Sequence, residues 1–310
     1  MNNIRVFSGS SHPELAIEIC QYLGVELSPS VHRRFSNDNL YIQLCESVRE
    51  TDVYIVQTFS PPVQDHLLEL LMMVDAARDA SARRVTAVVP YYSYARSDKK
   101  EEPRISIAGR LIADMFRTAG VSRLLTMTLH APQVHGFFSM PVDHLTAEPV
   151  QVEHFGAREL ANTIVVTPDI GNAKRASKFA RRLGLPLAAG NKRRLADDSV
   201  DIEEIVGSVE GKHAIIYDDE VANGGTVCEI ANLLRKRGAT GVTVACTHGV
   251  FSGPAIERLR DLEVDEIIAT NTVPILPDKR LPNMSVLSVA PVFGEAIRRI
   301  NLGESVSAIF

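Results

Sequence analysis

Short apolar runs alternate with longer amphipathic stretches along the whole chain. The runs predict strands, because a parallel strand buried on both faces reads as a continuous apolar segment. The stretches between them carry apolar residues at helical spacing and predict helices. The main predicted strands cover 5–8, 40–44, 53–57, 85–89, 124–128, 163–167, 187–189, 214–217 and a run ending at 247, and the main predicted helices cover 12–23, 63–80, 105–119, 173–183, 226–237 and 291–302. Strand and helix in alternation imply parallel pairing in an α/β fold.

The order of elements in the second half resembles that in the first, which indicates two related α/β halves. A length of 310 residues also exceeds the usual size of one domain. The segment 80–89 has a faint echo in 238–246, and the crossing between the halves falls near 145–153. We therefore expect domains at 1–146 and 147–310. The apolar residues near the C-terminus indicate docking onto a neighbour, which leaves open that this segment packs back on the first domain.

The stretch from 214 to 226 holds the strongest chemical signal. Four apolar residues lead into Asp218 and Asp219, and a Gly pair and Thr226 follow. This order predicts a buried strand that ends in a phosphate loop, because glycines let backbone N–H groups approach a phosphate at a helix N-terminus. The two acids suit sugar hydroxyls or a divalent cation, so a phosphorylated sugar is the ligand implied. The alternative is that the acids only cap a helix and the glycines form a turn.

Further polar residues follow predicted strands, at the sheet edge where open α/β folds bind ligands. His130 follows one strand and is either a packed or capping residue or a metal ligand. Asp169 follows another strand and is either an N-cap or part of a site for a phosphate or a metal. The cations of 191–194 form either a solvated face or an anion site, and the polar segment 195–201 has the character of a mobile lid. Phe35, alone in a polar loop, is either a core residue or a stacking plate.

Composition excludes several classes of function. The net charge is -5, with a pI near 6.0, so no basic stripe is available for nucleic acid. The four cysteines lack C-x-x-C spacing, which argues against a disulfide framework or a zinc site. No apolar run reaches the roughly 18 residues of a membrane span, and no signal peptide is recognisable. We expect a soluble, cytoplasmic protein without a membrane or nucleic-acid partner.

Neither a P-loop nor a G-x-G-x-x-G motif is present, so a nucleotide would be held in another way. Six other motifs lie along the chain: PYYSYARSD at 90–98, LHAPQVHGFF at 129–138, NKRR at 191–194, DDEVANGGT at 218–226, THGVFSGPA at 247–255 and ESVS at 304–307. Jointly these motifs are specific, and through them nearly the whole chain resembles the ribose-phosphate pyrophosphokinases. The resemblance implies two tandem type I phosphoribosyltransferase-like domains, each a mainly parallel sheet flanked by helices. It also implies transfer of the diphosphoryl group of Mg-ATP to O1 of ribose 5-phosphate, giving AMP and 5-phosphoribosyl 1-diphosphate.

The resemblance assigns roles to individual residues of this chain. Lys192 and Arg194 would stabilise charge on the transferring group, as phosphoryl-type transfer requires. His130 and Asp169 would hold Mg2+. Ribose 5-phosphate would be bound by Asp218, Asp219, Ala222, Asn223, Gly224, Gly225 and Thr226, and ATP by Phe35, Asn37, Asn39, Arg96, Ser97 and Asp98. Ser47, Arg49, Ser305 and Ser307 match positions where the family binds phosphate or ADP as effectors. A homo-oligomer built from dimers, usually a hexamer, is implied as well, with part of the ATP pocket supplied by an adjacent subunit.

The chain departs from the family pattern at several of these positions. Acids that the family usually carries are replaced by Thr128 and Ser139, and further departures are Asn39, Ser97, Ile170, Ala222 and Asn223. The departures motivate an alternative, a weakly active or inactive regulatory homologue that assembles with an active synthetase. A base-transferring phosphoribosyltransferase is disfavoured, because it needs neither two such domains nor the loop at 91–104. The active enzyme is favoured by the joint retention of six residues, Lys192, Arg194, Asp218, Asp219, Asp169 and His130.

Overall fold

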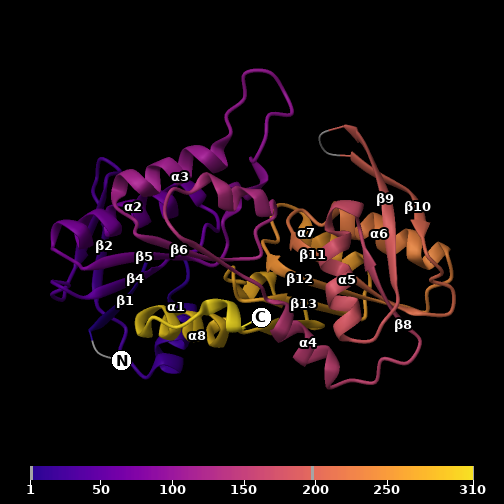
Figure 1. Ribbon diagram of the computed structural model, residues 1–310. Helices are drawn as coiled ribbons and strands as arrows, with labels where there is room; N and C mark the ends of the chain where they lie inside the picture. The colour runs from indigo at the N-terminus through magenta and orange to yellow at the C-terminus, as the bar shows by residue number, and fades with distance from the viewer. Residues whose placement is uncertain (1–2, 197–198, 310) are drawn as a thin grey trace. The chain divides into compact units, whose positions relative to one another are not determined.

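The computed structural model describes residues 3–196 and 199–309, and the side chains of these residues except 170 and 191–204. The chain forms two compact units. Unit 1 comprises Met1–Thr146, Thr272–Pro274 and Ser288–Phe310, and unit 2 comprises Ala147–Asn271 and Ile275–Leu287. The C-terminal segment thus belongs to unit 1, whose α1 and α8 lie side by side (Figure 1).

Unit 1 contains a parallel sheet of order β1-β4-β5-β6-β7. In Figure 1, α2 and α3 lie on one face of this sheet and α1 and α8 on the other. An antiparallel pair, β2 and β3, forms a separate hairpin. The strands are β1 Ile4–Ser8, β2 Ser30–Arg34, β3 Leu40–Leu44, β4 Asp52–Val56, β5 Arg84–Val89, β6 Arg123–Met127 and β7 Val142–Leu145. The helices are α1 Pro13–Leu23, α2 Val63–Asp79, α3 Ala108–Ala119 and α8 Ala290–Leu302, with short 3-10 turns η1 Ser93–Arg96, η2 Pro132–Phe137 and η5 Val306–Ile309.

Unit 2 contains a sheet of order β10-β9-β8-β11-β12-β13-β14, parallel except for the antiparallel pair β9 and β10. The strands are β8 Thr163–Thr167, β9 Leu187–Ala196, β10 Ser199–Val206, β11 His213–Val221, β12 Gly241–Gly249, β13 Glu266–Thr270 and β14 Met284–Leu287. The helices are α4 Glu148–Gly156, α5 Ala173–Arg182, α6 Gly225–Lys236 and α7 Ala255–Asp261, with turns η3 Ile170–Asn172 and η4 Pro277–Lys279.

The core of each unit follows from the apolar runs. All five residues of β4 and of β8 are buried, as expected of strands with an apolar run inside a parallel sheet. Helix α1 begins at Pro13 and ends where Gly24 takes a left-handed conformation with φ 67°, the usual way for a helix to stop. No helix in the described part of the chain is long and apolar enough to cross a membrane.

Two segments differ from the sequence-based expectation. The predicted lid at 195–201 falls within the hairpin of β9 and β10, apart from 197–198, which lie outside the described residues. The segment read as the crossing between the halves contains a helix, α4. Its apolar residues are few, so their spacing carried no helical signal.

Candidate active site

The predicted phosphate loop connects β11 to α6 in unit 2. Gly224, at the N-cap of α6, has φ 77° and ψ -4°, and a Cβ there would lie 3.5 Å from Ala255, so a glycine fits best. The loop therefore presents the N-terminus of a three-turn helix, whose N-terminal N–H groups and dipole attract anions. The Asn223 side chain accepts a hydrogen bond from one of these groups, the Gly225 N–H, at 3.0 Å.

A second loop holds the phosphate loop in place. The N–H groups of Val250 and Phe251 both donate to the Val221 carbonyl at 3.1 Å, and Ser252 N–H donates to the Ala222 carbonyl at 2.9 Å. Phe251 is fully buried with φ 43°, and its ring lies so close to Gly249 that a Cβ there would meet it at 2.5 Å. The motif at 247–255 thus braces the loop, a role that sequence reasoning missed although it identified the motif.

The two acids stand at the end of β11, before the loop. Asp219 is buried, and Asp218, partly buried, accepts a hydrogen bond from the Asp219 N–H at 2.8 Å. Burial raises the pKa of Asp218 well above its ordinary value, and the neighbouring carboxylates of Asp219 and Asp169 raise it further. One arginine, Arg175, lies 3.9 Å from Asp219. Asp218, Asp219 and Asp169 thus place several carboxyl groups together at one end of β11, an arrangement that a cation would stabilise.

Asp169 begins the turn after β8, beside these acids. Its side chain accepts a hydrogen bond from the Asn172 N–H at 2.9 Å, and the Asn172 amide in turn points to Asp218 at 3.4 Å. Asp169 therefore caps the short turn η3, while the N-cap of α5 itself is Asn172. The second carboxylate oxygen retains capacity for a metal ion, since an ionised carboxylate has about four acceptor sites.

The proposed catalytic pair lies on β9. The backbones of Lys192 and Arg194 pair with Ile202 and Val200 of β10. Their side chains lie outside the part of the chain whose side chains the structure describes.

Three of the proposed ATP residues lie at the turn of the β2–β3 hairpin in unit 1. Phe35 is 54% exposed and meets Tyr41 edge to face, with ring centroids 5.8 Å apart. This exposure rules out the core alternative for Phe35 and leaves its ring face available for stacking. Asn37 and Asn39 are also exposed, and the Asn37 side chain accepts a hydrogen bond from the Asn39 N–H at 3.3 Å.

The other proposed ATP residues follow β5 and have structural contacts as well. The Ser97 hydroxyl accepts a hydrogen bond from Ala108 N–H at 3.0 Å, so it satisfies a free donor at the start of α3. The Asp98 carboxylate accepts a hydrogen bond from the Gln133 amide. Arg96 is exposed at the end of η1.

The residues after β6, also in unit 1, include one with unusual backbone geometry. Thr128 is buried with φ 44°, a region that β-branched residues rarely adopt. His130 is exposed two residues later, and Ser139 is exposed as well. Strained residues concentrate at functional sites, which draws attention to this turn.

The effector candidates are exposed residues of unit 1. Arg49 donates to the Ser81 hydroxyl at 3.3 Å, and Arg299 donates to the Ser305 carbonyl at 3.1 Å. Ser47 and Ser307 are exposed too.

Comparison with known proteins assigns the family. Residues 4–120 match the N-terminal domain of ribose phosphate pyrophosphokinase, and residues 196–310 match the phosphoribosyl synthetase-associated domain. The ribose-phosphate pyrophosphokinase of Deinococcus radiodurans is 52% identical, over 98% of this chain and 97% of its own. That of Synechococcus elongatus is 46% identical, over 100% of this chain and 94% of its own.

A solved structure agrees with these relatives. The crystal structure of phosphoribosylpyrophosphate synthetase from Mycobacterium smegmatis superposes with a TM-score of 0.92 at 40% identity, covering 97% of this chain and 100% of that one. The predicted fold class, two tandem phosphoribosyltransferase-like domains, is confirmed. The chain belongs to the ribose-phosphate pyrophosphokinase family.

Proposed function

We propose that the protein transfers the β,γ-diphosphoryl group of ATP to O1 of ribose 5-phosphate. The O1–Pβ bond forms, the bond between Pβ and the α-phosphate oxygen breaks, AMP leaves, and the O1 proton is released. The observation that carries the proposal is the acid pair Asp218 and Asp219 directly before a glycine loop at the N-terminus of α6. This arrangement suits both parts of a sugar phosphate, because the carboxylates can accept hydrogen bonds from the sugar hydroxyls and the N–H groups can donate to the phosphate.

The residues of unit 2 supply positioning and charge. The N–H groups at the start of α6, with Thr226, hold the 5-phosphate, and Asp218 and Asp219 accept hydrogen bonds from the ribose hydroxyls. Lys192 and Arg194 neutralise charge that develops on the diphosphoryl group. Such transfer needs little covalent chemistry from a protein, so orientation and cations account for most of the rate enhancement.

Mg2+ fits the donor set of this site. Oxygen ligands are those that Mg2+ prefers, and Asp169 lies beside the carboxyl group of Asp218. Asp169 would hold the ion, which when bound supplies charge neutralisation on the phosphates of ATP. The assignment of His130 to the metal follows from the family resemblance and stays a prediction.

ATP binding involves residues of unit 1. The exposed ring of Phe35 stacks on adenine, and Asn37, Asn39, Arg96, Ser97 and Asp98 complete the pocket. We further propose a homo-oligomer built from dimers, a cytoplasmic location, and phosphate or ADP as effectors at Ser47, Arg49, Ser305 and Ser307. The regulatory alternative rests on departures from the family pattern such as Thr128 and Ser139. The relatives named above are themselves called ribose-phosphate pyrophosphokinases, which favours the active enzyme over this alternative.

The test is formation of AMP and 5-phosphoribosyl 1-diphosphate from ATP and ribose 5-phosphate with Mg2+, in the wild type and in Lys192→Ala. We expect turnover in the wild type and a loss of at least 100-fold in the variant, the order expected when a group that stabilises transition-state charge is removed. Asp169→Asn should raise the Mg2+ concentration that gives half the maximal rate. Wild-type turnover no greater than that of Lys192→Ala would contradict the proposed function.

A further inference from the structure

The hairpin of β2 and β3 carries Phe35, Asn37 and Asn39 at its turn, yet it does not belong to the five-stranded sheet of unit 1. An isolated two-stranded hairpin is marginally stable in water, so its position depends on the groups that it contacts. These contacts therefore determine the position of the Phe35 ring, which is proposed to stack on adenine.

One face of the hairpin is directed at α2 and the end of β1. Side chains on a strand alternate, so Ser30, His32 and Arg34 of β2 share a face. The His32 ring lies 3.2 Å from Glu69, and Arg34 lies 2.7 Å from Asp65. Asp65 and Glu69 are one turn apart on α2, and a turn of helix rises about as far as two strand residues, so the two pairs form successive links.

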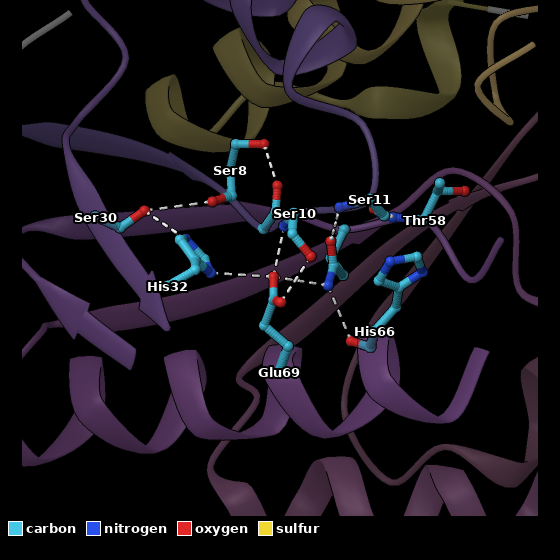
Figure 2. Close-up of polar contacts among 10 residues, drawn as sticks. Ser8, Ser10, Ser11, Ser30, His32, Thr58, His66 and Glu69 are labelled. Atoms are coloured by element: carbon cyan, nitrogen blue, oxygen red, sulfur yellow. Dashed lines mark hydrogen bonds and ion pairs between the residues drawn. The ribbon is translucent and has the colours of Figure 1, made fainter. Parts of the chain in front are cut away.

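Glu69 is the centre of the polar contacts at this face (Figure 2). Its carboxylate accepts hydrogen bonds from the Ser10 N–H, from the Ser10 hydroxyl at 2.7 Å and from the Gln57 amide at 3.1 Å. On the other side of the His32 ring, Nε2 lies 2.8 Å from the Ser30 hydroxyl, which also contacts the Ser8 carbonyl at 3.4 Å. A continuous polar chain therefore joins the end of β1, α2 and the hairpin.

The pair of His32 and Glu69 is the stronger of the two links. Its side chains are 23% and 5% exposed, whereas those of Arg34 and Asp65 are 40% and 44% exposed. Exposed ion pairs contribute about 0 to 1 kcal/mol, while removing one partner of a buried pair costs considerably more. A cavity of about 300 Å³, lined among others by His32, Arg34 and Glu69, opens beside them. Ile42 and Leu44 of β3 pack against the core of unit 1, so apolar packing holds the β3 side of the hairpin, and the polar contacts orient β2.

The charge state of Glu69 favours its contact with His32. Burial alone would raise the pKa of its carboxyl, but the nearby His32 ring and the hydrogen bonds from Ser10 outweigh burial and hold the pKa below its usual range. The carboxylate is thus ionised at neutral pH and can attract the ring N–H of His32.

We propose that Glu69 is a positioning residue for the nucleotide: through His32 it fixes the β2–β3 hairpin and so the orientation of Phe35 towards adenine. The inference rests on the proposed function, because it takes ATP as the ligand of the hairpin turn. Glu69 does not itself touch ATP. Its loss weakens ATP binding and leaves ribose 5-phosphate binding, which belongs to the α6 loop of unit 2, unchanged.

Three variants test the link. Glu69→Gln keeps an oxygen that accepts from Ser10 and Gln57 but loses the charge that pairs with His32. His32→Ala removes the link from the other side. His32→Asn places an amide donor near the position of Nδ1, which faces Glu69, and should restore the link. A matched control is Glu148→Gln in unit 2, because Glu148 is a similarly buried glutamate held by Lys178 and Arg182.

The experiment measures KM for ATP and for ribose 5-phosphate, kcat and the oligomeric state of each full-length variant. We expect Glu69→Gln and His32→Ala to raise KM for ATP at least fivefold with KM for ribose 5-phosphate within twofold of wild type. His32→Asn and Glu148→Gln should stay within twofold for both substrates. A residue with a merely structural role would change both KM values or neither, and any such pattern overturns the proposal, as does the same split in Glu148→Gln.

Binding of α,β-methylene-ATP, measured by calorimetry, separates this proposal from the proposed function. A wild type without turnover contradicts the proposed function, whereas weaker analogue binding by Glu69→Gln than by wild type still supports the positioning role. Equal analogue binding by wild type and Glu69→Gln refutes the role of Glu69 even in an active enzyme.

Discussion

The substitution Asn223→Asp tests the phosphate loop by changing a single atom group. In the structure the Asn223 side-chain oxygen already accepts the Gly225 N–H at 3.0 Å, at the N-terminus of α6. An aspartate in the same conformation keeps this hydrogen bond and adds a negative charge to it. The ligand-free protein should gain about 0.3 to 1 kcal/mol, because a carboxylate interacts favourably with the helix dipole.

The same charge opposes the 5-phosphate. A phosphate oxygen that approaches these N–H groups would stand roughly 4 to 5 Å from the new carboxylate, where two unit charges repel by about 1 to 4 kcal/mol. The affinity for ribose 5-phosphate should therefore fall by about 5- to 700-fold, since about 1.4 kcal/mol corresponds to a factor of ten. Stability and substrate affinity thus change in opposite directions.

The assay combines thermal unfolding of the ligand-free protein with calorimetric titration of ribose 5-phosphate. Asn223→Ala serves as the control, because it removes the side-chain acceptor without adding charge and should change affinity by less than about fivefold, the worth of one neutral hydrogen bond. Unchanged affinity in Asn223→Asp would refute the placement of the 5-phosphate at the start of α6.

The remaining predictions concern stability. Gly9→Ala should destabilise the protein by about 2 to 3 kcal/mol, because a Cβ at Gly9 would lie 2.3 Å from the Gln57 side-chain oxygen, which accepts a hydrogen bond from the Ser11 N–H. The control in thermal unfolding is Gly156→Ala, because a Cβ at Gly156 would have no neighbour within 4 Å. Equal losses of stability in the two variants would contradict the steric argument. Asp52→Asn should cost about 1 to 2 kcal/mol at pH 7, because burial raises the pKa of Asp52 but hydrogen bonds from Arg84 and Arg83 outweigh it and lower the pKa to about 2. A depressed carboxyl pKa stabilises the fold above the unfolded value of 3.8, so the difference between wild type and Asp52→Asn in urea unfolding should shrink as the pH falls from about 4 towards 2; a difference independent of pH would count against the ion pair.

The sequence predicted the elements whose pattern is locally strong. The buried strand before Asp218, the glycine turn and the helix that begins at Gly225 all follow from residues that are neighbours in the chain. The apolar runs of β4 and β8 likewise carry their own signal. The family and the fold class, drawn from motifs spread over the whole chain, are confirmed.

Contacts between distant residues could not be predicted in this way. Glu69 lies in the middle of an amphipathic helix, where an acid normally faces solvent, and only the fold brings it to Ser10 and His32. The Ser97 hydroxyl, assigned to ATP from its motif, also caps α3 because the chain returns at Ala108. The left-handed backbone conformation of Thr128 could not be predicted, because threonine rarely adopts it.

The identity of the transferred group tests the central claim most directly. Wild-type protein is incubated with ribose 5-phosphate, Mg2+ and ATP labelled at the γ-phosphate, and the products are separated. Diphosphoryl transfer predicts one AMP for each sugar product, with the label in the diphosphate at C1. Formation of ADP with a single labelled phosphate on the sugar, or no labelled sugar product at all, would contradict the account.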